Sequence, residues 1–182
     1  MKKVMNAVIC LLLTCVLGGC ATFQKPLFNM GLWFERYRSG LAYKTVEADG
    51  QTFAYLEREG EGETIVLVHG FSAEKDNWIR FVRHMPEEYR ILAIDMPGHG
   101  DNKGDMDQTY KIEHFTNAVA QAIEALGPER VHIVGHSFGG LVSTLYALDN
   151  PGRVITLGLF DSDGIHSPKP SESEELLDKG EN

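Results

Sequence analysis

The chain has 182 residues, a formal net charge of −9 and 43% hydrophobic residues, which suits a single domain. Its 24% of charged residues and its ordinary glycine and proline content exclude a disordered tail or a fibrous repeat. The acidic balance, with no run of Lys or Arg longer than a pair, argues against a nucleic-acid-binding surface. All three cysteines lie in the first 20 residues, so the rest of the chain offers neither an internal disulfide nor a Cys-rich metal site. Since Gly-x-Gly-x-x-Gly is also absent, we expect no cofactor and no metal.

The first 20 residues have the pattern of a targeting segment. Lys2 and Lys3 precede an apolar stretch, Val4–Leu17, that is too short to span a membrane comfortably but suits a signal peptide. The stretch ends in Leu17-Gly18-Gly19-Cys20, which resembles the bacterial lipobox.

The lipobox resemblance implies a lipid-anchored protein of the bacterial cell envelope. Residues 1–19 would be a lipoprotein signal peptide, and lipid on Cys20 would tether the chain to a membrane without crossing it. Ala21 follows the cysteine where an Asp would favour the inner membrane, so the resemblance favours the outer membrane if the organism is Gram-negative.

Residues 20–42 are predicted to form the lipidated tether. Five apolar residues in it are expected to pack a short helix onto the domain: Leu27, Phe28, Leu32, Trp33 and Tyr37.

From residue 43 the hydropathy pattern predicts strands that alternate with helices. The predicted strands are Tyr43–Ala48, Thr52–Glu57, Thr64–Val68, Arg90–Ile94, Val131–Val134 and Val154–Phe160. The predicted helices are one with Trp78, Phe81, Val82 and Met85 on one face and Asp76 as its cap, then Ile112–Leu126, ended by Gly127, and Leu141–Leu148. Short β-branched runs are typical of strands buried on both faces, so we expect a three-layer α/β sheet, mostly parallel after an opening hairpin.

One motif of a kind that carries catalysis lies between the fifth predicted strand and its helix. It is Gly135-His136-Ser137-Phe138-Gly139, a match to G-x-S-x-G. A serine nucleophile must be exposed on a sharp strand-to-helix turn, and glycines two residues to either side relieve the crowding there. A helix N-terminus also places backbone N–H groups beside a developing oxyanion.

With this motif the chain resembles the N-terminal part of an α/β-hydrolase of the lipase and esterase branch. His69-Gly70-Phe71 matches the family's oxyanion loop, and Asp95-Met96-Pro97-Gly98-His99-Gly100 matches its D-x-P-G-x-G turn. The resemblance implies that Ser137 is the nucleophile and that the backbone N–H groups of Phe138 and Phe71 form the oxyanion hole. His69, Gly70, Gly135, His136 and Gly139 would support these motifs, and Asp95 would hold its own loop. Asn102 stands where the family often has Ser, which we interpret as surface variation.

The resemblance covers residues 43–166, a partial domain with strands 1–6 of an eight-strand plan. Residues 167–182 would be the start of a cap or a disordered tail. The cap, strands 7 and 8, and the triad acid and histidine would be absent, and Asp161 is a weak alternative for the acid. Losing a triad member lowers turnover by about 10⁴- to 10⁶-fold, so we expect this chain to be inactive or weak as it stands.

The predicted function is hydrolysis of carboxylic esters through a Ser137 acyl-enzyme, on a small-molecule or lipid ester. The sequence leaves open a thioesterase or carbon–carbon hydrolase of the same fold. It also leaves open a non-catalytic surface lipoprotein that binds a partner along the exposed edge of its sixth strand.

Overall fold

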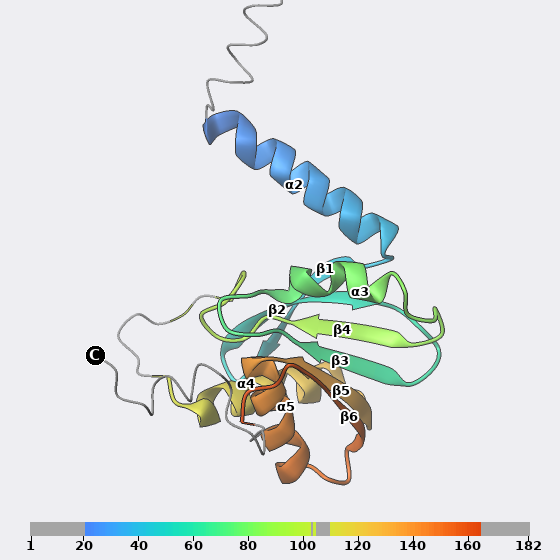
Figure 1. The fold of residues 1–182 in the computed structure, drawn as a ribbon, viewed down its shortest axis with the longest axis vertical. Helices are drawn as coiled ribbons and strands as arrows, with labels where there is room; N and C mark the ends of the chain where they lie inside the picture. The colour runs from blue at the N-terminus through green and yellow to red at the C-terminus, as the bar shows by residue number, and fades with distance from the viewer. Residues whose placement is uncertain (1–20, 103, 105–109, 165–182) are drawn as a thin grey trace, which may run out of the picture.

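The computed structural model describes residues 21–102, 104 and 110–164, with side chains from residue 26 onward (Figure 1). Within these residues, one sheet has the strand order β1-β2-β4-β3-β5-β6. The strands are β1 (Ala42–Ala48), β2 (Gln51–Arg58), β3 (Thr64–Val68), β4 (Arg90–Ile94), β5 (Val131–His136) and β6 (Val154–Phe160). The predicted signal peptide, lipid site and C-terminal segment from residue 167 lie outside the described residues.

The strand predictions are confirmed, and so is the mixed pairing. β1 and β2 form the antiparallel hairpin, whose turn residues Asp49 and Gly50 both have positive φ, at 48° and 77°. β2 also pairs antiparallel with β4, whereas β3 pairs parallel with β4 and β5, and β5 with β6. The carboxyl ends of the four parallel strands therefore share one edge of the sheet, where an open α/β sheet builds its site.

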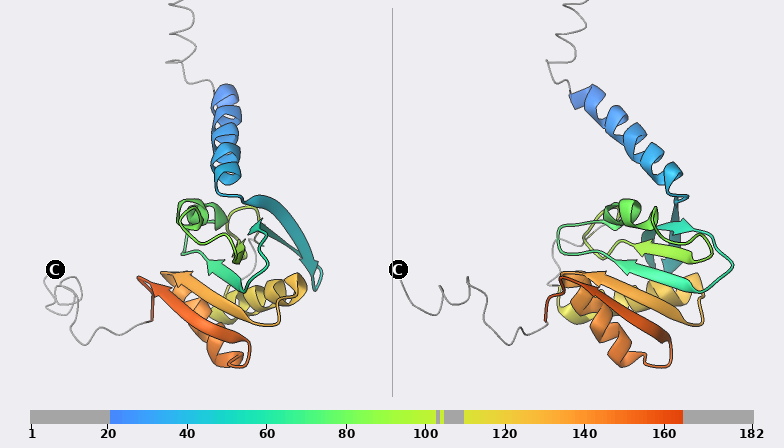
Figure 2. Two further views of the ribbon diagram at one scale, coloured as in Figure 1. Left: turned by 90° about the vertical axis from the view of Figure 1, so that its right-hand side faces the viewer. Right: turned by 45° about the vertical axis from the view of Figure 1, so that its right-hand side comes forward.

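Helices cover both faces of this sheet (Figure 2). α4 (Ile112–Leu126) and α5 (Phe138–Asp149) pack on one face, and the 3₁₀ turn η1 (Lys75–Trp78) with α3 (Ile79–Val82) packs on the other. α4 has the predicted bounds and ends at Gly127, whose φ of 78° is the left-handed conformation that glycine tolerates best. α5 begins three residues before the predicted helix, directly after Ser137.

The helix predicted around Trp78 is shorter than expected. Its four-residue α3 follows a 3₁₀ turn whose N-cap is Glu74, so the prediction that Asp76 caps the helix is wrong. The Asp76 carboxylate instead accepts two hydrogen bonds of 2.6 Å from Arg36. A pattern of apolar residues cannot reveal that partner, because Arg36 is 40 residues away in the sequence.

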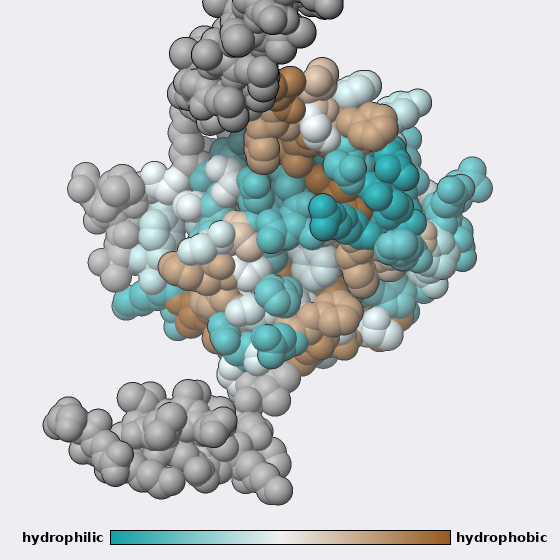
Figure 3. All heavy atoms as spheres, turned by 45° about the horizontal axis from the view of Figure 1, so that its top comes forward, coloured by the Kyte–Doolittle hydropathy of each residue, from teal (hydrophilic) through white to brown (hydrophobic). Residues whose placement is uncertain are grey.

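The N-terminal helix α2 (Ala21–Arg38) projects away from the sheet in Figures 1 and 2. It is longer than predicted, and its apolar residues do not pack on the domain as expected, except that Leu32 contacts the core beside α3. The exposed ones are Leu27, Phe28, Met30, Trp33, Phe34 and Tyr37. In Figure 3, apolar side chains gather beside the grey atoms at the top of the view. Among the described residues, no helix has both the length and the apolar character that a membrane span requires.

β6 lies at one edge of the sheet. Within the described part of the chain it pairs with β5 alone, and Leu157, Leu159 and Phe160 remain 37%, 36% and 47% exposed. An apolar edge of this kind offers unpaired backbone groups and apolar side chains to another strand.

Candidate active site

Ser137 occupies a strained turn between β5 and α5. Its φ of 50° and ψ of −122° lie outside the regions that residues other than glycine favour, at a cost of roughly 1–3 kcal/mol. Hydrogen bonds hold the turn in place: the Ser137 N–H donates to the Phe160 carbonyl at 3.0 Å, and the Ser137 carbonyl accepts from the N–H groups of Gly140 and Asp163. The strain is thus maintained by the backbone of β6 and of the first turn of α5.

Three glycines allow this turn to be tight. A Cβ on Gly135 would lie 2.3 Å from the Gly139 carbonyl oxygen, and one on Gly140 would lie 2.3 Å from Ser162 Oγ. A Cβ on Gly139 would lie 2.2 Å from the carbonyl oxygen of His69. The last contact shows that the first turn of α5 packs directly on the chain leaving β3, so the two motifs identified in the sequence touch through their backbones.

The loop after β3 approaches the serine closely. A Cβ on Gly70 would lie 3.2 Å from Ser137 Cβ and 3.1 Å from His136 Nδ1. The Phe71 N–H donates to no backbone carbonyl among the described residues. Phe138 is the first residue of α5, so its N–H has no partner four residues earlier within the helix. Two backbone donors therefore flank the serine, as an oxyanion hole requires.

A pocket of about 430 Å³ opens at this point. It is lined by Ser137, His136, aromatic side chains and four residues of the loop after β3: His69, Gly70, Phe71 and Ala73. Trp78, Phe81 and Phe160 form an aromatic cluster on its wall, with ring centroids 5.4 to 6.4 Å apart. Phe71 and Phe138 stand edge to face at 6.3 Å. A wall of this kind favours an apolar chain over a charged one, because aromatic rings bury apolar surface without offering charge partners.

A larger hollow of about 680 Å³ lies elsewhere, between the start of β2, the turn after β4 and α4. Its lining is mainly polar and includes neither Ser137 nor its flanking loop. We therefore place the candidate site at the smaller pocket, which contains Ser137.

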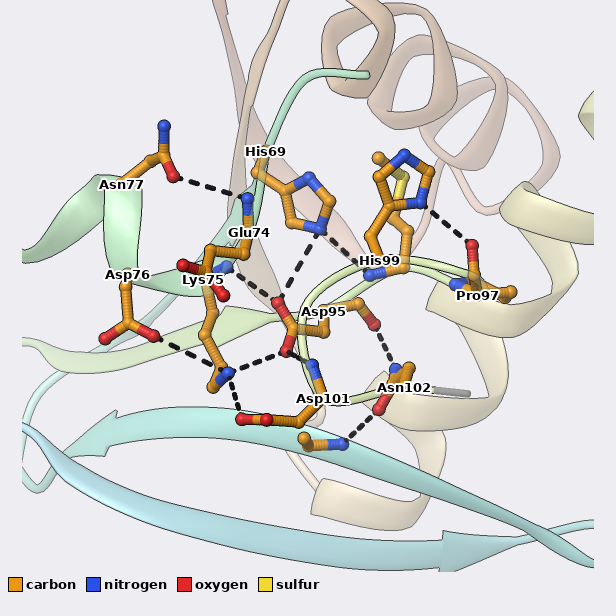
Figure 4. A network of polar contacts seen from close by, with 12 residues as sticks. His69, Glu74, Lys75, Asp76, Asn77, Asp95, Pro97, His99, Asp101 and Asn102 are labelled. Carbon is orange, nitrogen blue, oxygen red and sulfur yellow. Dashed lines mark hydrogen bonds and ion pairs between the residues drawn. The ribbon is translucent and has the colours of Figure 1, made fainter. Parts of the chain in front are cut away.

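Beneath the loop after β3 lies a buried network of charges (Figure 4). Asp95, directly after β4, is fully buried. Lys75 donates to both of its carboxylate oxygens: the backbone N–H to Oδ1 and Nζ to Oδ2, each at 2.7 Å. Lys75 Nζ also donates to Asp101 Oδ2 at 2.7 Å and lies 3.6 Å from Asp76 Oδ2. Burial disfavours the ammonium form, but hydrogen bonds to Asp101 and Asp95 outweigh it and raise the pKa of Lys75.

His69 links this network to the loop. The Met96 N–H donates to His69 Nε2 at 3.0 Å, so Nε2 carries no proton, and Nδ1–H donates to the Gly70 carbonyl at 2.8 Å. Burial lowers the pKa of His69 to about 4, although the Gly70 carbonyl and Asp95 oppose the shift. His69 is therefore a neutral support of the loop and not a base.

These features agree with the comparisons with known proteins. The family described as "alpha/beta hydrolase fold" matches residues 63–179. The chain belongs to this family. The match begins at β3 and includes the loop after it, the turn after β4 and the whole elbow around Ser137.

Three relatives illustrate the likeness. A solved structure of a membrane phospholipase A, described as a bacterial virulence factor, is 36% identical with a TM-score of 0.79, covering 100% of this chain and 59% of that one. Lipase 1 of Psychrobacter immobilis is 34% identical over 149 residues, 79% of this chain and 47% of the lipase. The dihydrolipoyllysine-residue acetyltransferase component of the acetoin cleaving system of Cupriavidus necator is 33% identical over 145 residues, 80% of this chain and 37% of that protein. The chain thus spans less than half the length of these two curated relatives.

The remaining candidate residues fall in different places. Asp161 lies exposed just after β6 with a φ of 45°. Among the described residues, no histidine is hydrogen-bonded to Ser137: His132 contacts Thr156 and Glu63, and His114 accepts from the Lys111 N–H. His99 lies in the turn after β4, with its ring 5.2 Å from that of His69.

Sequence reasoning missed two supports of the site. The interpretation of Asn102 as surface variation is wrong: it is buried, its Oδ1 accepts from the Ala54 N–H at 2.7 Å, and its Nδ2 donates to the Asp95 carbonyl. The pairing of Lys75 with Asp95 was missed because it spans 20 residues. The nearest signal was a lysine close after a strand end, which by itself predicts an exposed side chain.

Proposed function

We propose that the protein is a serine hydrolase that cleaves carboxylic esters with an apolar acyl chain. The observation that carries the proposal is the strained Ser137 at the N-terminus of α5, beside an aromatic pocket and two backbone N–H groups that have no partner in the described part of the chain. The similarity to a membrane phospholipase A and to a lipase supports a lipid ester as the substrate.

In the proposed reaction, Ser137 Oγ attacks the ester carbonyl to form a tetrahedral intermediate, and its proton passes to a general base. The N–H groups of Phe71 and Phe138 donate to the developing oxyanion, whose charge their fixed dipoles stabilise. The alcohol leaves with a proton, and water then attacks the acyl-enzyme to release the acid and free Ser137. The aromatic cluster of Trp78, Phe81 and Phe160 would hold the acyl chain.

The test is covalent labelling of Ser137 in the full chain purified from its own membranes. A fluorophosphonate should modify the wild type on the peptide that contains Ser137, and Ser137→Ala should abolish both the label and ester hydrolysis. Ser72→Ala, in the neighbouring loop, is the matched control and should retain the label. Labelling elsewhere, or hydrolysis retained in Ser137→Ala, would contradict the assignment. Thioesters of the same chain length, assayed in parallel, decide between oxyester and thioester cleavage.

We also propose that the protein is a lipoprotein of the cell envelope, anchored through Cys20. α2 begins directly after this cysteine, and its exposed apolar residues include Trp33, Phe34 and Tyr37, a composition typical of membrane interfaces. Intact mass of the extracted protein should show removal of residues 1–19 and the added mass of lipid. Cys20→Ser should release the chain from membranes, whereas Cys15→Ser, within the signal segment, should not. An unlipidated mature protein would contradict the anchor.

A further inference from the structure

Lys75 has no contact with the candidate pocket, yet it is fully buried. Its ammonium donates hydrogen bonds of 2.7 Å to the carboxylates of Asp95 and Asp101. Its backbone N–H donates to Oδ1, the other carboxylate oxygen of Asp95. Gly100 accommodates this carboxylate, because a Cβ there would lie 2.2 Å from Asp95 Oδ2. A lysine enclosed in this way does not contribute to solubility. Its ammonium balances the charge of a specific buried carboxylate.

The charge matters because Asp95 faces His69. Asp95 Oδ1 lies 3.8 Å from His69 Nε2, and both side chains are fully buried. An uncompensated carboxylate at this distance would draw a proton onto the imidazole. A proton on Nε2 would face the Met96 N–H, since both groups would then be donors, and the 3.0 Å hydrogen bond between them would be lost.

The state of His69 bears on the proposed oxyanion hole through one peptide bond. His69 Nδ1–H holds the Gly70 carbonyl, and that carbonyl belongs to the same planar unit as the Phe71 N–H. In a trans peptide the two groups point in opposite directions, so fixing the carbonyl also fixes the direction of the donor. The Ala73 N–H donates to the same carbonyl at 3.3 Å.

We propose that Lys75 is a positioning residue: by neutralising Asp95, it keeps His69 Nε2 unprotonated and hydrogen-bonded to the Met96 N–H. This bond holds the ring where its Nδ1–H fixes the Gly70 carbonyl, and with it the direction of the Phe71 N–H toward the carbonyl under attack. The last step rests on the proposed function, whereas the link from Lys75 through Asp95 to His69 does not. Asp95 lies between the two as the shared partner.

The other titratable groups around His69 do not replace this role. His99, in the turn after β4, has its ring 5.2 Å away, and His136 lines the same pocket from the elbow. Asp101 reaches Lys75 and is half-exposed, so its charge is better screened than that of Asp95. Asp95 is thus the dominant charge near His69, and Lys75 is the group that balances it.

The test is the titration and tautomer of His69, read by nitrogen and carbon NMR of histidine-labelled full chain and assigned by loss of its signals in His69→Asn. We expect wild-type His69 to be neutral at pH 7 with the proton on Nδ1. Lys75→Met should raise its pKa by at least about 1 unit. Lys75→Met/Asp95→Asn should reverse that rise, because it removes both charges. Lys44→Met, which removes a partly exposed lysine of β1, is the control and should leave His69 unchanged.

Activity tests the positioning step separately. Lys75→Met should lower kcat at least about 10-fold with little change in KM, since the donor acts mainly on the transition state, and the double variant should recover most of the loss. A raised His69 pKa without a loss of kcat would overturn the positioning role. A wild-type chain without turnover would contradict the hydrolase function instead, while the His69 titration would still test the charge link.

Two results would overturn the charge link itself. One is a wild-type His69 that is protonated, or carries its proton on Nε2, at pH 7. The other comes from Asp95→Asn alone, which serves also if Lys75→Met does not fold. This variant leaves Lys75 paired with Asp101, so the pKa of His69 should fall. A rise in that pKa would contradict the proposal.

Discussion

The two sides of the candidate pocket are each stabilised by a different kind of interaction. The elbow from residue 135 to 140 depends on backbone contacts so close that no side chain fits, as at Gly135 and Gly139. The loop from residue 69 to 78 depends on buried side-chain charges, chiefly Lys75 and Asp95. The elbow should therefore be sensitive to added volume and the loop to unbalanced charge.

The largest expected effect is on the charged side. Lys75→Met leaves the buried Asp95 carboxylate without its partner, which should lower the free energy of unfolding by about 3–5 kcal/mol. Urea unfolding followed by circular dichroism measures the loss. Lys75→Met/Asp95→Asn should lose less than half as much, because no isolated charge remains. Equal losses in the two variants would mean that lost packing, and not charge, dominates.

The next effect is on the elbow. Gly139→Ala places a Cβ 2.2 Å from the His69 carbonyl oxygen and should cost about 3 kcal/mol, because both contacting segments are backbone and neither can move alone. Gly152→Ala is the matched control: a Cβ there meets nothing within 4 Å, so the change in stability should stay within about 1 kcal/mol. A small loss at Gly139 would show that the elbow tolerates volume and would weaken the comparison.

A third effect follows from the neutral His69. Since its pKa is about 4 in the folded chain and its ordinary value is 6.5, the unfolded state binds more protons between these pH values. Stability therefore falls as the pH drops through this window, with a contribution from His69 of about 2 kcal/mol between pH 7 and pH 5. Urea unfolding at the two pH values should show a smaller difference for His69→Asn than for the wild type. His84→Asn, at an exposed position, should match the wild type, and a His69→Asn chain with an unchanged difference would contradict the buried neutral imidazole.

The same contrast explains what the sequence could predict. The elbow was predictable, because a glycine that no side chain can replace appears directly as a letter at a fixed spacing. β3 and β4 were predicted to the residue for a related reason: a strand buried on both faces shows as an uninterrupted apolar run. β6 has the same apolar run and was also predicted to the residue, although it lies at the edge of the sheet and is only partly buried. These signals are local in the sequence, so they can be recognised without knowledge of the fold.

The charged side was not predictable, since its partners meet only after folding. Lys75 and Asp101 are 26 residues apart, and Arg36 and Asp76 are 40 apart. No spacing rule connects such pairs. The packing of α2 failed for the opposite reason: an apolar pattern shows that a face avoids water but does not specify which surface covers it, and Trp33 is 63% exposed.

The smallest expected effect belongs to a neutral hydrogen-bonding support on the charged side. Asn102 joins the Ala54 N–H of β2 to the Asp95 carbonyl, so Asn102→Ala leaves one buried donor and one buried acceptor without their partner. We expect a loss of about 1.5 kcal/mol in the free energy of unfolding, less than for Lys75→Met because no charge is left unpaired. Asn117→Ala, on the exposed face of α4, should change stability by no more than about 0.5 kcal/mol. If Asn102→Ala matched this control, the turn would be held by charge alone, which would sharpen the distinction between the two sides of the pocket.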